Sequence, residues 1–414
     1  MPTYYPLRTA VILMLSHVAG MIDLVALPLW IGALVGHYGL DYERAGLTVT
    51  LFLGGAVAAC LALAPCFDRL PRRPCAIGGY ALASLALVLV AQNRSWPVLL
   101  ALHLLAGAGT GCALSMAHGA MGRGANPHRL FAFAGAALGV FALVFYAIVP
   151  QVMSRIGAPG LFLVMGGVMA CAALGALAFP EGRSHEPVGS PAQGAASGAI
   201  PRRAWLLVIG TALLALNQSL VFSFLERIGI ARGFGSGQVN AVLAAIGLVN
   251  LVPAALAGLL QRRLPSAPLA VAAAALQACL ALIVTSSTTF MPYAVAAGVY
   301  AFVLIFAHTF LFGLAARIDP SGRTTALTPA MLMTGSAIGP ALAGTVAHRF
   351  GFSGIGLAVG VGALACIACF VLLGRRMRQA VRGMDAMAGL AQPAVPDQPR
   401  RALTPRGANP IPPD

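Results

Sequence analysis

A single acidic side chain, Asp23, lies deep inside the first long apolar stretch of the chain. Of the 11 acidic residues in the sequence, Asp23 is the one that lies well inside an apolar segment. Removal from water disfavours the charged form of a carboxyl group, so an acid here can take up a proton and release it where water reaches. Asp23 is therefore the first candidate for proton coupling, and the alternative is a structural acid bonded to a neighbouring helix.

Further polar side chains interrupt the apolar stretches and offer contacts for a proton or a solute. His103 is the second proton-coupling candidate because histidine titrates near neutral pH; the alternative is a buried histidine bonded to a neighbouring helix. Glu226 ends an apolar stretch beside Arg227, where an interfacial ion pair is the expected arrangement. The candidates for a substrate cavity are His17, Asn217, Gln218 and His308.

The sequence does not predict an enzyme. A membrane-embedded enzyme needs a nucleophile–base pair or a metal cluster, and no His-x-x-x-His or comparable set occurs. The Cys366-x-x-Cys369 pair lies in an apolar stretch without a nearby histidine or acid, which favours a packing role. The chain has no lysine, so it has no phosphate-binding loop that ends in Gly-Lys. We expect no cofactor, no metal and no use of ATP by this chain.

These residues lie in a chain with the composition of a membrane protein. It is 59% hydrophobic and 9% charged, whereas a soluble domain carries about 25% charged residues. Apolar stretches of about 20 residues can cross about 30 Å of hydrocarbon, and they must be helices because lipid offers backbone groups no partner. The sequence predicts an all-α membrane protein with 12 transmembrane helices, at about 9–35, 45–64, 74–91, 96–118, 130–152, 160–179, 204–225, 238–260, 268–286, 291–314, 325–346 and 354–373.

The predicted helices form two sets of six that repeat at an offset of 194 residues. The turn Asp68-Arg69-Leu70-Pro71 corresponds to Arg262-Arg263-Leu264-Pro265, Gly39 to Gly233, Gly157 to Gly351, and Asp23 to Asn217. Many matches at one offset indicate an internal duplication and two pseudo-symmetric six-helix bundles. Asn217 therefore places a neutral polar group opposite Asp23, between two halves, where substrate sites form in transporters.

Changes in composition set the limits of the two halves. We expect an N-terminal six-helix bundle at 1–180 and a C-terminal one at 204–378. The segment 181–203 between them is rich in Gly, Ser, Pro and Ala and is expected to be a cytoplasmic linker. The last segment, 379–414, is expected to be a disordered cytoplasmic tail.

The net charge of +15 indicates orientation rather than nucleic-acid binding. With the N-terminus inside, 20 of the 26 arginines fall in cytoplasmic segments and six on the other side, which is the positive-inside bias. Both termini are therefore predicted in the cytoplasm, with the chain in a bacterial-type inner (plasma) membrane. No aromatic–basic platform for nucleic acid accompanies the charge. The expected partners are the lipid bilayer, protons and a small-molecule substrate, and the chain is expected to be a monomer.

Two parallel six-helix repeats joined by a polar linker resemble the major facilitator superfamily of transporters, over about residues 8–378. The family signature between helices two and three is Gly-x-x-x-Asp-Arg-x-Gly-Arg-Arg. Asp68, Arg69, Arg72 and Arg73 match it, while Ala64 and Pro71 replace the glycines. The resemblance implies that this turn is a gating latch that faces helix ends and arginines across the halves, with Arg262 and Arg263 at the duplicate turn. The alternative is that these arginines only set orientation.

The resemblance also bears on His103, which stands where the family often has an arginine associated with proton handling. Together these features predict a secondary active transporter that moves a small organic solute by alternating access, coupled to protons. Every arginine lies in a loop or near a helix end, so the expected substrate is neutral, weakly polar or amphipathic rather than strongly anionic. The alternative is a membrane sensor or scaffold that keeps a transporter shell but does not transport.

Overall fold

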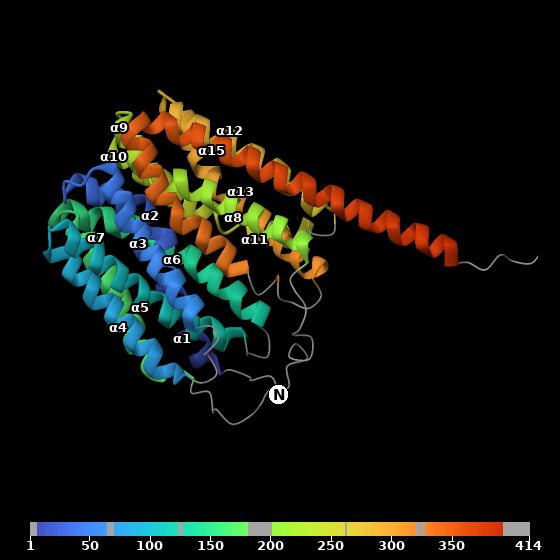
Figure 1. The fold of residues 1–414 in the computed structure, drawn as a ribbon. Coiled ribbons are helices and arrows are strands. Elements are labelled where there is room, and N and C mark those ends of the chain that lie inside the picture. The colour runs from blue at the N-terminus through green and yellow to red at the C-terminus, as the bar shows by residue number, and fades with distance from the viewer. Residues whose placement is uncertain are drawn as a thin grey trace, which may run out of the picture. The chain divides into compact units, whose positions relative to one another are not determined.

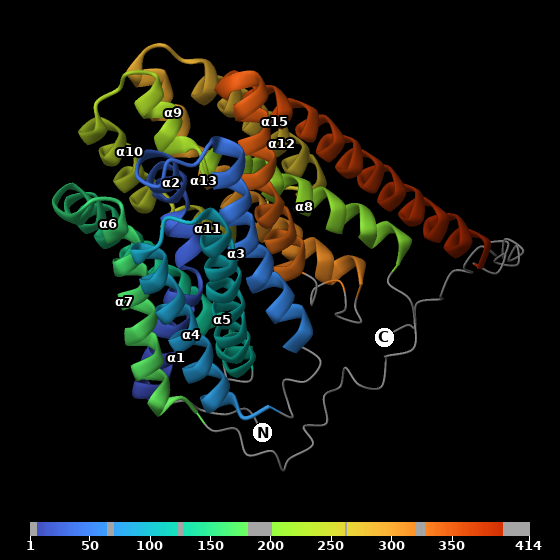
Figure 2. The same ribbon diagram turned by 60° about the vertical axis from the view of Figure 1, so that its left-hand side comes forward.

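The computed structural model describes residues 6–63, 70–122, 127–180, 201–260, 263–319, 324 and 328–391. These ranges are helical almost throughout, and no β-strand occurs in them. The chain divides into two units, Met1–Gly374 and Arg375–Asp414. The first unit holds two six-helix bundles, whose helices run alongside one another in Figures 1 and 2.

The N-terminal bundle contains six spanning segments, of which the first is divided into two helices. These segments are α1 (Leu7–Gly20) followed by α2 (Ile22–Gly36), α3 (Tyr42–Leu63), α4 (Arg72–Gln92), α5 (Trp96–Gly122), α6 (Pro127–Ile156) and α7 (Pro159–Gly175), which a 3-10 turn η2 (Ala176–Ala178) extends.

The C-terminal bundle repeats this order with more interruptions. Its segments are α8 (Arg202–Phe222) followed by α9 (Leu225–Ala231), α10 (Ser236–Val249) followed by α11 (Pro253–Leu260), α12 (Ser266–Ser286), α13 (Phe290–Ile318) and the long α15 (Thr328–Ala391). Gly351 has non-helical backbone angles and divides α15 into the last two spans.

The twelve-helix prediction agrees with these segments, although they are not twelve continuous helices. Ten helices in the described ranges have the length and composition of a spanning segment, and one of them, Ala330–Gln379, has 50 residues and turns at Gly351. The remaining span is α10 with α11. It is interrupted before Pro253, which has no N–H to continue a helix and fits the first position of the next one.

Residues 379–391, where the disordered tail was expected to begin, continue α15 as helix. Alanine and methionine are strong helix formers and recur in this stretch, which favours helix there. Residues 181–200 and 392–414 lie outside the described part of the chain. The limits of the two halves stay a prediction.

Four glycines with positive φ mark one end of the two bundles, which we call the glycine-turn end. Gly39 (φ 68°), Gly157 (φ 79°), Gly233 (φ 82°) and Gly351 (φ 70°) each connect two spanning segments there. Only glycine enters this region of backbone angles without a steric penalty. The four residues are the two pairs related by the 194-residue offset, so the turns have the same backbone conformation in both copies of the duplication. The opposite end, which includes the start of α1 and of α8, is called the linker end.

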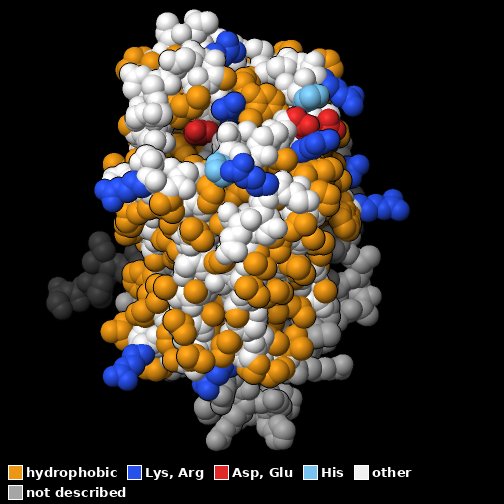
Figure 3. Space-filling view, turned by 90° about the vertical axis from the view of Figure 1, so that its left-hand side faces the viewer, with side chains coloured by type: hydrophobic (Ala, Val, Ile, Leu, Met, Phe, Trp, Pro, Cys, Tyr) orange, Lys and Arg blue, Asp and Glu red, His pale blue; other side chains and the backbone are white. Residues whose placement is uncertain are grey.

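Glycines also allow the helices within the N-terminal bundle to approach closely. A Cβ atom on Gly107 of α5 would overlap the backbone of Phe52 in α3, and one on Gly111 would overlap the backbone of Ala56. Contacts of this kind between small residues are the main means of helix packing in lipid, where no hydrophobic force drives helices together. Figure 3 shows the resulting surface, with hydrophobic side chains across the middle and charged side chains toward the two ends.

Candidate functional site

The first spanning segment is interrupted at Met21, and this break positions Asp23. Met21 N–H donates to His17 O (3.0 Å), and Leu24 N–H donates back to Met21 O (3.2 Å), which makes a tighter turn between α1 and α2. Asp23 is the second residue of α2 and is half-buried. Its carboxyl group interacts electrostatically with the Cys60 thiol of α3. The start of a helix carries partial positive charge, which stabilises an anion, so this environment can hold Asp23 in either protonation state.

The first span of the second half is also interrupted, but not at the duplicate position. Residues Ser223 and Phe224 separate α8 from α9, and Phe224 N–H donates to Val221 O (3.1 Å). The duplicate of Met21 is Ala215, which lies inside α8. Interrupted helices near the interface of the two halves are a known feature of transporter binding sites, and both halves contribute one here.

His17 of α1 pairs with His118 of α5, which is not among the residues predicted from the sequence. His17 Nδ1 and His118 Nε2 are 2.9 Å apart, and the two rings are stacked with their centroids 5.1 Å apart. One nitrogen must donate and the other accept, so the bond needs one unprotonated nitrogen. His118 is the last residue of the predicted fourth span, 96–118, and a polar residue at a helix end needs no special role. The pairing therefore could not be predicted from the position of His118 alone.

His103 lies in a closed aromatic cluster in which both ring nitrogens have partners. Trp30 Nε1–H donates to His103 Nε2 (3.1 Å), and His103 Nδ1–H donates to Leu99 O (2.7 Å). A carbonyl only accepts, so these two bonds fix the neutral tautomer. His103 is fully buried, and the ring of Phe162 packs against its edge. This geometry supports the structural alternative for His103.

We therefore expect His103→Ala to destabilise the protein and to leave proton coupling in the folded fraction intact. The substitution leaves Trp30 Nε1–H buried without a partner, which costs about 1–3 kcal/mol, and adds a cavity. The measurement is the thermal unfolding temperature in detergent, with His348→Ala, an exposed histidine in α15, as the matched control. Normal stability combined with lost coupling would contradict this role and restore His103 as a proton carrier.

Asn217 and Gln218, which were predicted to lie opposite Asp23, contact other helices of the second half instead. Asn217 is fully buried, and its side chain packs against Gly362 of α15. Gln218 accepts a hydrogen bond from Gln277 Nε2 of α12 (3.2 Å). Both contacts lie within the C-terminal bundle, so these two side chains join its helices. His308 of α13 is half-buried, and its Nδ1 lies 2.9 Å from Leu304 O in its own helix.

The predicted latch is described only in part. Asp68, Arg69 and Arg262 lie outside the described residues. Arg73 Nε–H donates to Phe179 O (3.1 Å) within the N-terminal bundle, and Arg203 makes the similar bond to Ile318 O (3.3 Å) within the other bundle. Arg72 and Arg263 lie at the same end as these residues. The gating role of the turn stays a prediction.

The two bundles contact each other through glycines near the glycine-turn end. A Cβ atom on Gly46 of α3 would overlap the backbone of Pro340 in α15, and one on Gly344 of α15 would overlap the backbone of Tyr42. Ala341 N–H of α15 donates to Thr50 Oγ1 of α3 (3.0 Å). Both glycines lie seven residues from a glycine turn, Gly46 after Gly39 and Gly344 before Gly351. The backbones of α3 and α15 therefore touch, and this contact joins the halves.

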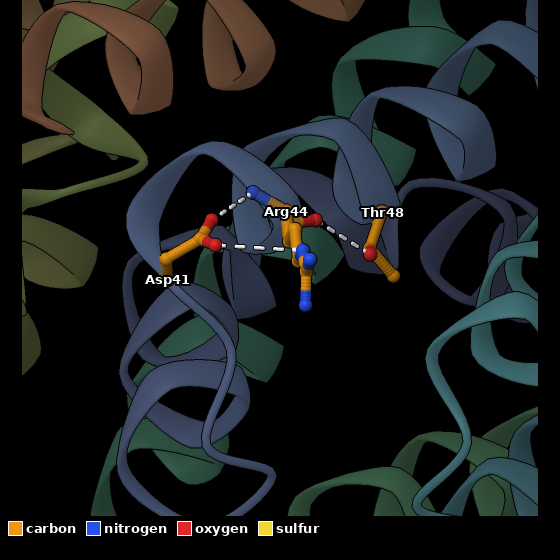
Figure 4. Close-up of polar contacts among 3 residues, drawn as sticks. All are labelled: Asp41, Arg44 and Thr48. Atoms are coloured by element: carbon orange, nitrogen blue, oxygen red, sulfur yellow. Dashed lines mark hydrogen bonds and ion pairs between the residues drawn. The ribbon is translucent and has the colours of Figure 1, made fainter.

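Aromatic rings and a helix cap complete this contact. Tyr42 packs against Phe224 and Phe352 of the other half, with ring centroids 5.9 and 5.2 Å apart. Figure 4 shows the start of α3, where Asp41 Oδ1 accepts a bond from Arg44 N–H (2.7 Å) and Asp41 Oδ2 forms an ion pair with Arg44 Nε (3.5 Å). Thr48 Oγ1–H donates to Arg44 O (2.7 Å). Because Asp41 caps the helix, the first turn of α3 holds Tyr42 firmly in position.

A second pair of helices meets across the halves closer to the middle of the bundles. Leu251, between α10 and α11, would collide with a Cβ atom on Gly139 of α6, and Gly247 of α10 lies against Leu143 of α6.

A third contact joins α2 to α9 through Gly32 and Glu226. The duplication offered a signal for the third contact, because Gly32 and Glu226 are 194 residues apart. Residues near a two-fold axis lie close to their own duplicates.

Comparison with known proteins agrees with this architecture. The Major Facilitator Superfamily sequence model matches residues 11–326. No curated protein matches the chain significantly.

Among solved structures, a variant of the nucleoside transporter NupG has a TM-score of 0.73 at 12% identity, covering 89% of this chain and 100% of that one. The D-xylose-proton symporter has a TM-score of 0.69 at 14% identity, covering 88% and 96%. A bacterial homologue of the human lysosomal transporter Spinster, in an inward-facing and occupied conformation, has a TM-score of 0.66 at 15% identity, covering 89% and 96%. The family match spans most of the chain and the fold is the same, so this protein belongs to the Major Facilitator Superfamily.

Proposed function

We propose that the protein is a secondary active transporter that moves a small organic solute and couples this movement to protons, with Asp23 as the coupling residue. The position of Asp23, half-buried in the first turn after the break in the first spanning segment, is the observation that carries the coupling. Membership of a transporter family and the fold support the proposal that the protein transports a solute. The protein acts as a monomer and catalyses no chemical reaction.

Alternating access is supported by where the halves meet. The contacts of α3 with α15 and of α2 with α9 gather toward the glycine-turn end, and we infer from them that this end is sealed in this conformation. In the predicted orientation it is the outer side of an inner membrane. A rigid-body movement of the halves that separates Gly46 from Pro340 opens the outer side and brings the cytoplasmic ends together.

The substrate is expected to be neutral or amphipathic. A groove of about 300 Å³ between α8 and α15 has a largely apolar lining that includes Trp205, Leu213, Met331 and Ile338, with Thr334 as a polar member. Pockets for small molecules begin at about this size. The descriptions of two structural neighbours name nucleosides and D-xylose as their solutes. Both kinds of solute are uncharged, which is consistent with this class.

A screen for thermal stabilisation tests the proposed function directly. A compound that binds the native state raises the unfolding temperature in proportion to the logarithm of its concentration. We expect uncharged polar or amphipathic solutes to stabilise the purified protein, and radiolabelled hits to show counterflow in liposomes. Folded protein that binds a ligand but shows no counterflow would favour a sensor or scaffold over a transporter.

The orientation gives a further prediction. Reporter fusions at Ser190 and after Arg382 should report the cytoplasm, and a fusion at Asn93 should report the outside, because the positive-inside bias fixes both termini inside. An alkaline phosphatase and green fluorescent protein pair measures the two sides independently. A reversed signal at any of the three positions would contradict the proposed orientation.

A further inference from the structure

The contact between α2 and α9 contains a carboxyl oxygen, Glu226 Oε2, that is buried without a hydrogen-bond partner among the described residues. It lies on the backbone of α2 at Gly32, where a Cβ atom would collide with it. The space for the carboxyl group therefore exists because residue 32 is glycine. The contact belongs to the sealed end, since Gly32 and Glu226 each lie seven residues before a glycine turn, at Gly39 and Gly233.

The groups around Glu226 do not supply a bonding partner. Arg227 is adjacent in sequence and acts on Glu226 electrostatically. Neighbouring residues of a helix point about 100° apart, and the expected ion pair between these two described residues does not form. The Tyr293 hydroxyl of α13 interacts electrostatically with Glu226, but it donates its proton to Leu225 O (2.8 Å). Facing it, α2 has no titratable side chain after Asp23. The other packed helices add none in α10 and only the exposed Cys279 in α12.

We propose that Glu226 is a proton-binding site that controls closure of the glycine-turn end, such that this end seals only when Glu226 is protonated. A charged carboxylate pressed against helix backbone loses its hydration and gains no compensating bond, whereas the neutral acid can be buried. When the halves separate, water reaches Glu226 and it ionises. A group that is neutral in one conformation and charged in the other links the conformational equilibrium to pH. This inference rests on the proposed alternating access and adds its regulation.

The site differs from Asp23 in what it contributes to transport. Glu226 lies at the contact that seals this end, so it takes up and returns its proton on the same side of the membrane. It adds no proton to the transport stoichiometry. In the predicted orientation, acid outside closes the outer side and favours the inward-facing state, so Glu226 makes the conformational change sensitive to external pH.

Distance measurements between the halves test the proposal independently of transport. Spin labels on Ser95→Cys and Thr288→Cys, exposed residues that lie at the glycine-turn end in opposite halves, are placed in a cysteine-free background. We expect the short-distance population to increase as the pH falls. Glu226→Gln, which mimics the protonated form, should stay at short distance at every pH. The control Glu43→Gln changes an exposed glutamate at the same end and should titrate as the parent does.

The glycine provides a second variant that distinguishes this mechanism from a general packing defect. Gly32→Ala displaces the carboxyl group and should deplete the short-distance population at low pH, and adding Glu226→Ala should restore it without pH dependence. Gly36→Ala adds the same methyl group one turn later in α2, where nothing lies within 4 Å, and should have no effect. No rescue in the double variant would overturn the proposal, as would Glu226→Gln with the parent's pH dependence.

The two proposals can fail separately. Loss of the pH-dependent distances in Asp23→Asn, with Glu226→Gln unchanged, would assign the conformational proton to Asp23 and reject the role of Glu226. Suppose that Glu226→Gln loses the pH dependence of the distances and that the parent protein accumulates solute equally with and without a pH gradient. This result would support the role of Glu226 in closing the glycine-turn end and reject proton coupling.

Discussion

Asp23→Asn is expected to abolish accumulation of the solute against its gradient while solute exchange across the membrane continues. Asparagine has the shape of the protonated aspartic acid but cannot release a proton. The variant can therefore bind the solute and change conformation, but the pH gradient no longer drives a net cycle. For one proton per solute, a gradient of one pH unit supplies about 1.4 kcal/mol, which is a roughly tenfold accumulation. We expect this ratio to fall to about one.

The measurement uses proteoliposomes with an imposed pH gradient and a solute found by thermal stabilisation. Asp41→Asn makes the same chemical change at an exposed aspartate, and since asparagine also caps helices well, it should accumulate solute as the parent protein does. Loss of folding in Asp23→Asn would favour the structural alternative. Undiminished accumulation would reject the coupling role and direct attention to the His17–His118 pair.

The membrane architecture could be predicted from the sequence because its signals are strong and repeated. Apolar stretches of spanning length must become helices in lipid, and punctuation repeated at a fixed offset indicated two equivalent halves. Gly39 and Gly157 were matched to Gly233 and Gly351 from spacing alone, and the structure gives all four a positive φ. The sequence did not indicate the breaks at Met21, at Ser223 and Phe224, and before Pro253, nor the extension of α15 through Ala391.

The arrangement of the side chains was harder to predict, because it depends on helix rotation and on breaks that the duplication does not preserve. Asn217 was expected opposite Asp23 by the 194-residue offset. However, α1 breaks at Met21 whereas α8 continues past the duplicate residue, Ala215. Asn217 therefore lies in a continuous helix that turns it toward Gly362 of α15. Likewise, the partner of His103 is Trp30, 73 residues away, and no local pattern identifies such a pair.

The glycines of the structure fall into two groups with opposite expected effects, and this difference gives the second large prediction. Gly111 packs α5 against α3 within one half, whereas Gly46 packs α3 against α15 of the other half. A larger side chain at Gly111 disturbs a contact that is needed in every conformation. At Gly46 it disturbs a contact that, under alternating access, is needed only in the sealed state.

We therefore expect Gly46→Val to remain folded but to stay open at the glycine-turn end, with transport nearly lost. Its side chain overlaps the backbone of Pro340, which cannot move aside as a side chain can. A penalty of about 3 kcal/mol on the sealed state lowers its population relative to the open state roughly 100-fold. Gly111→Val should instead lower the unfolding temperature, because the overlap with Ala56 persists whichever way the transporter faces.

Gly54→Val is the matched control, since Gly54 lies in the same helix as Gly46 and has nothing within 4 Å of an added Cβ atom. Unfolding temperature, transport and the distance between labels at Ser95 and Thr288 together separate the three variants. Gly54→Val should match the parent in all three measurements, while Gly46→Val should keep the unfolding temperature and lose the short distance. Rapid transport by Gly46→Val would contradict a cycle that seals this end, because α3 and α15 cannot close on a valine without moving their backbones apart.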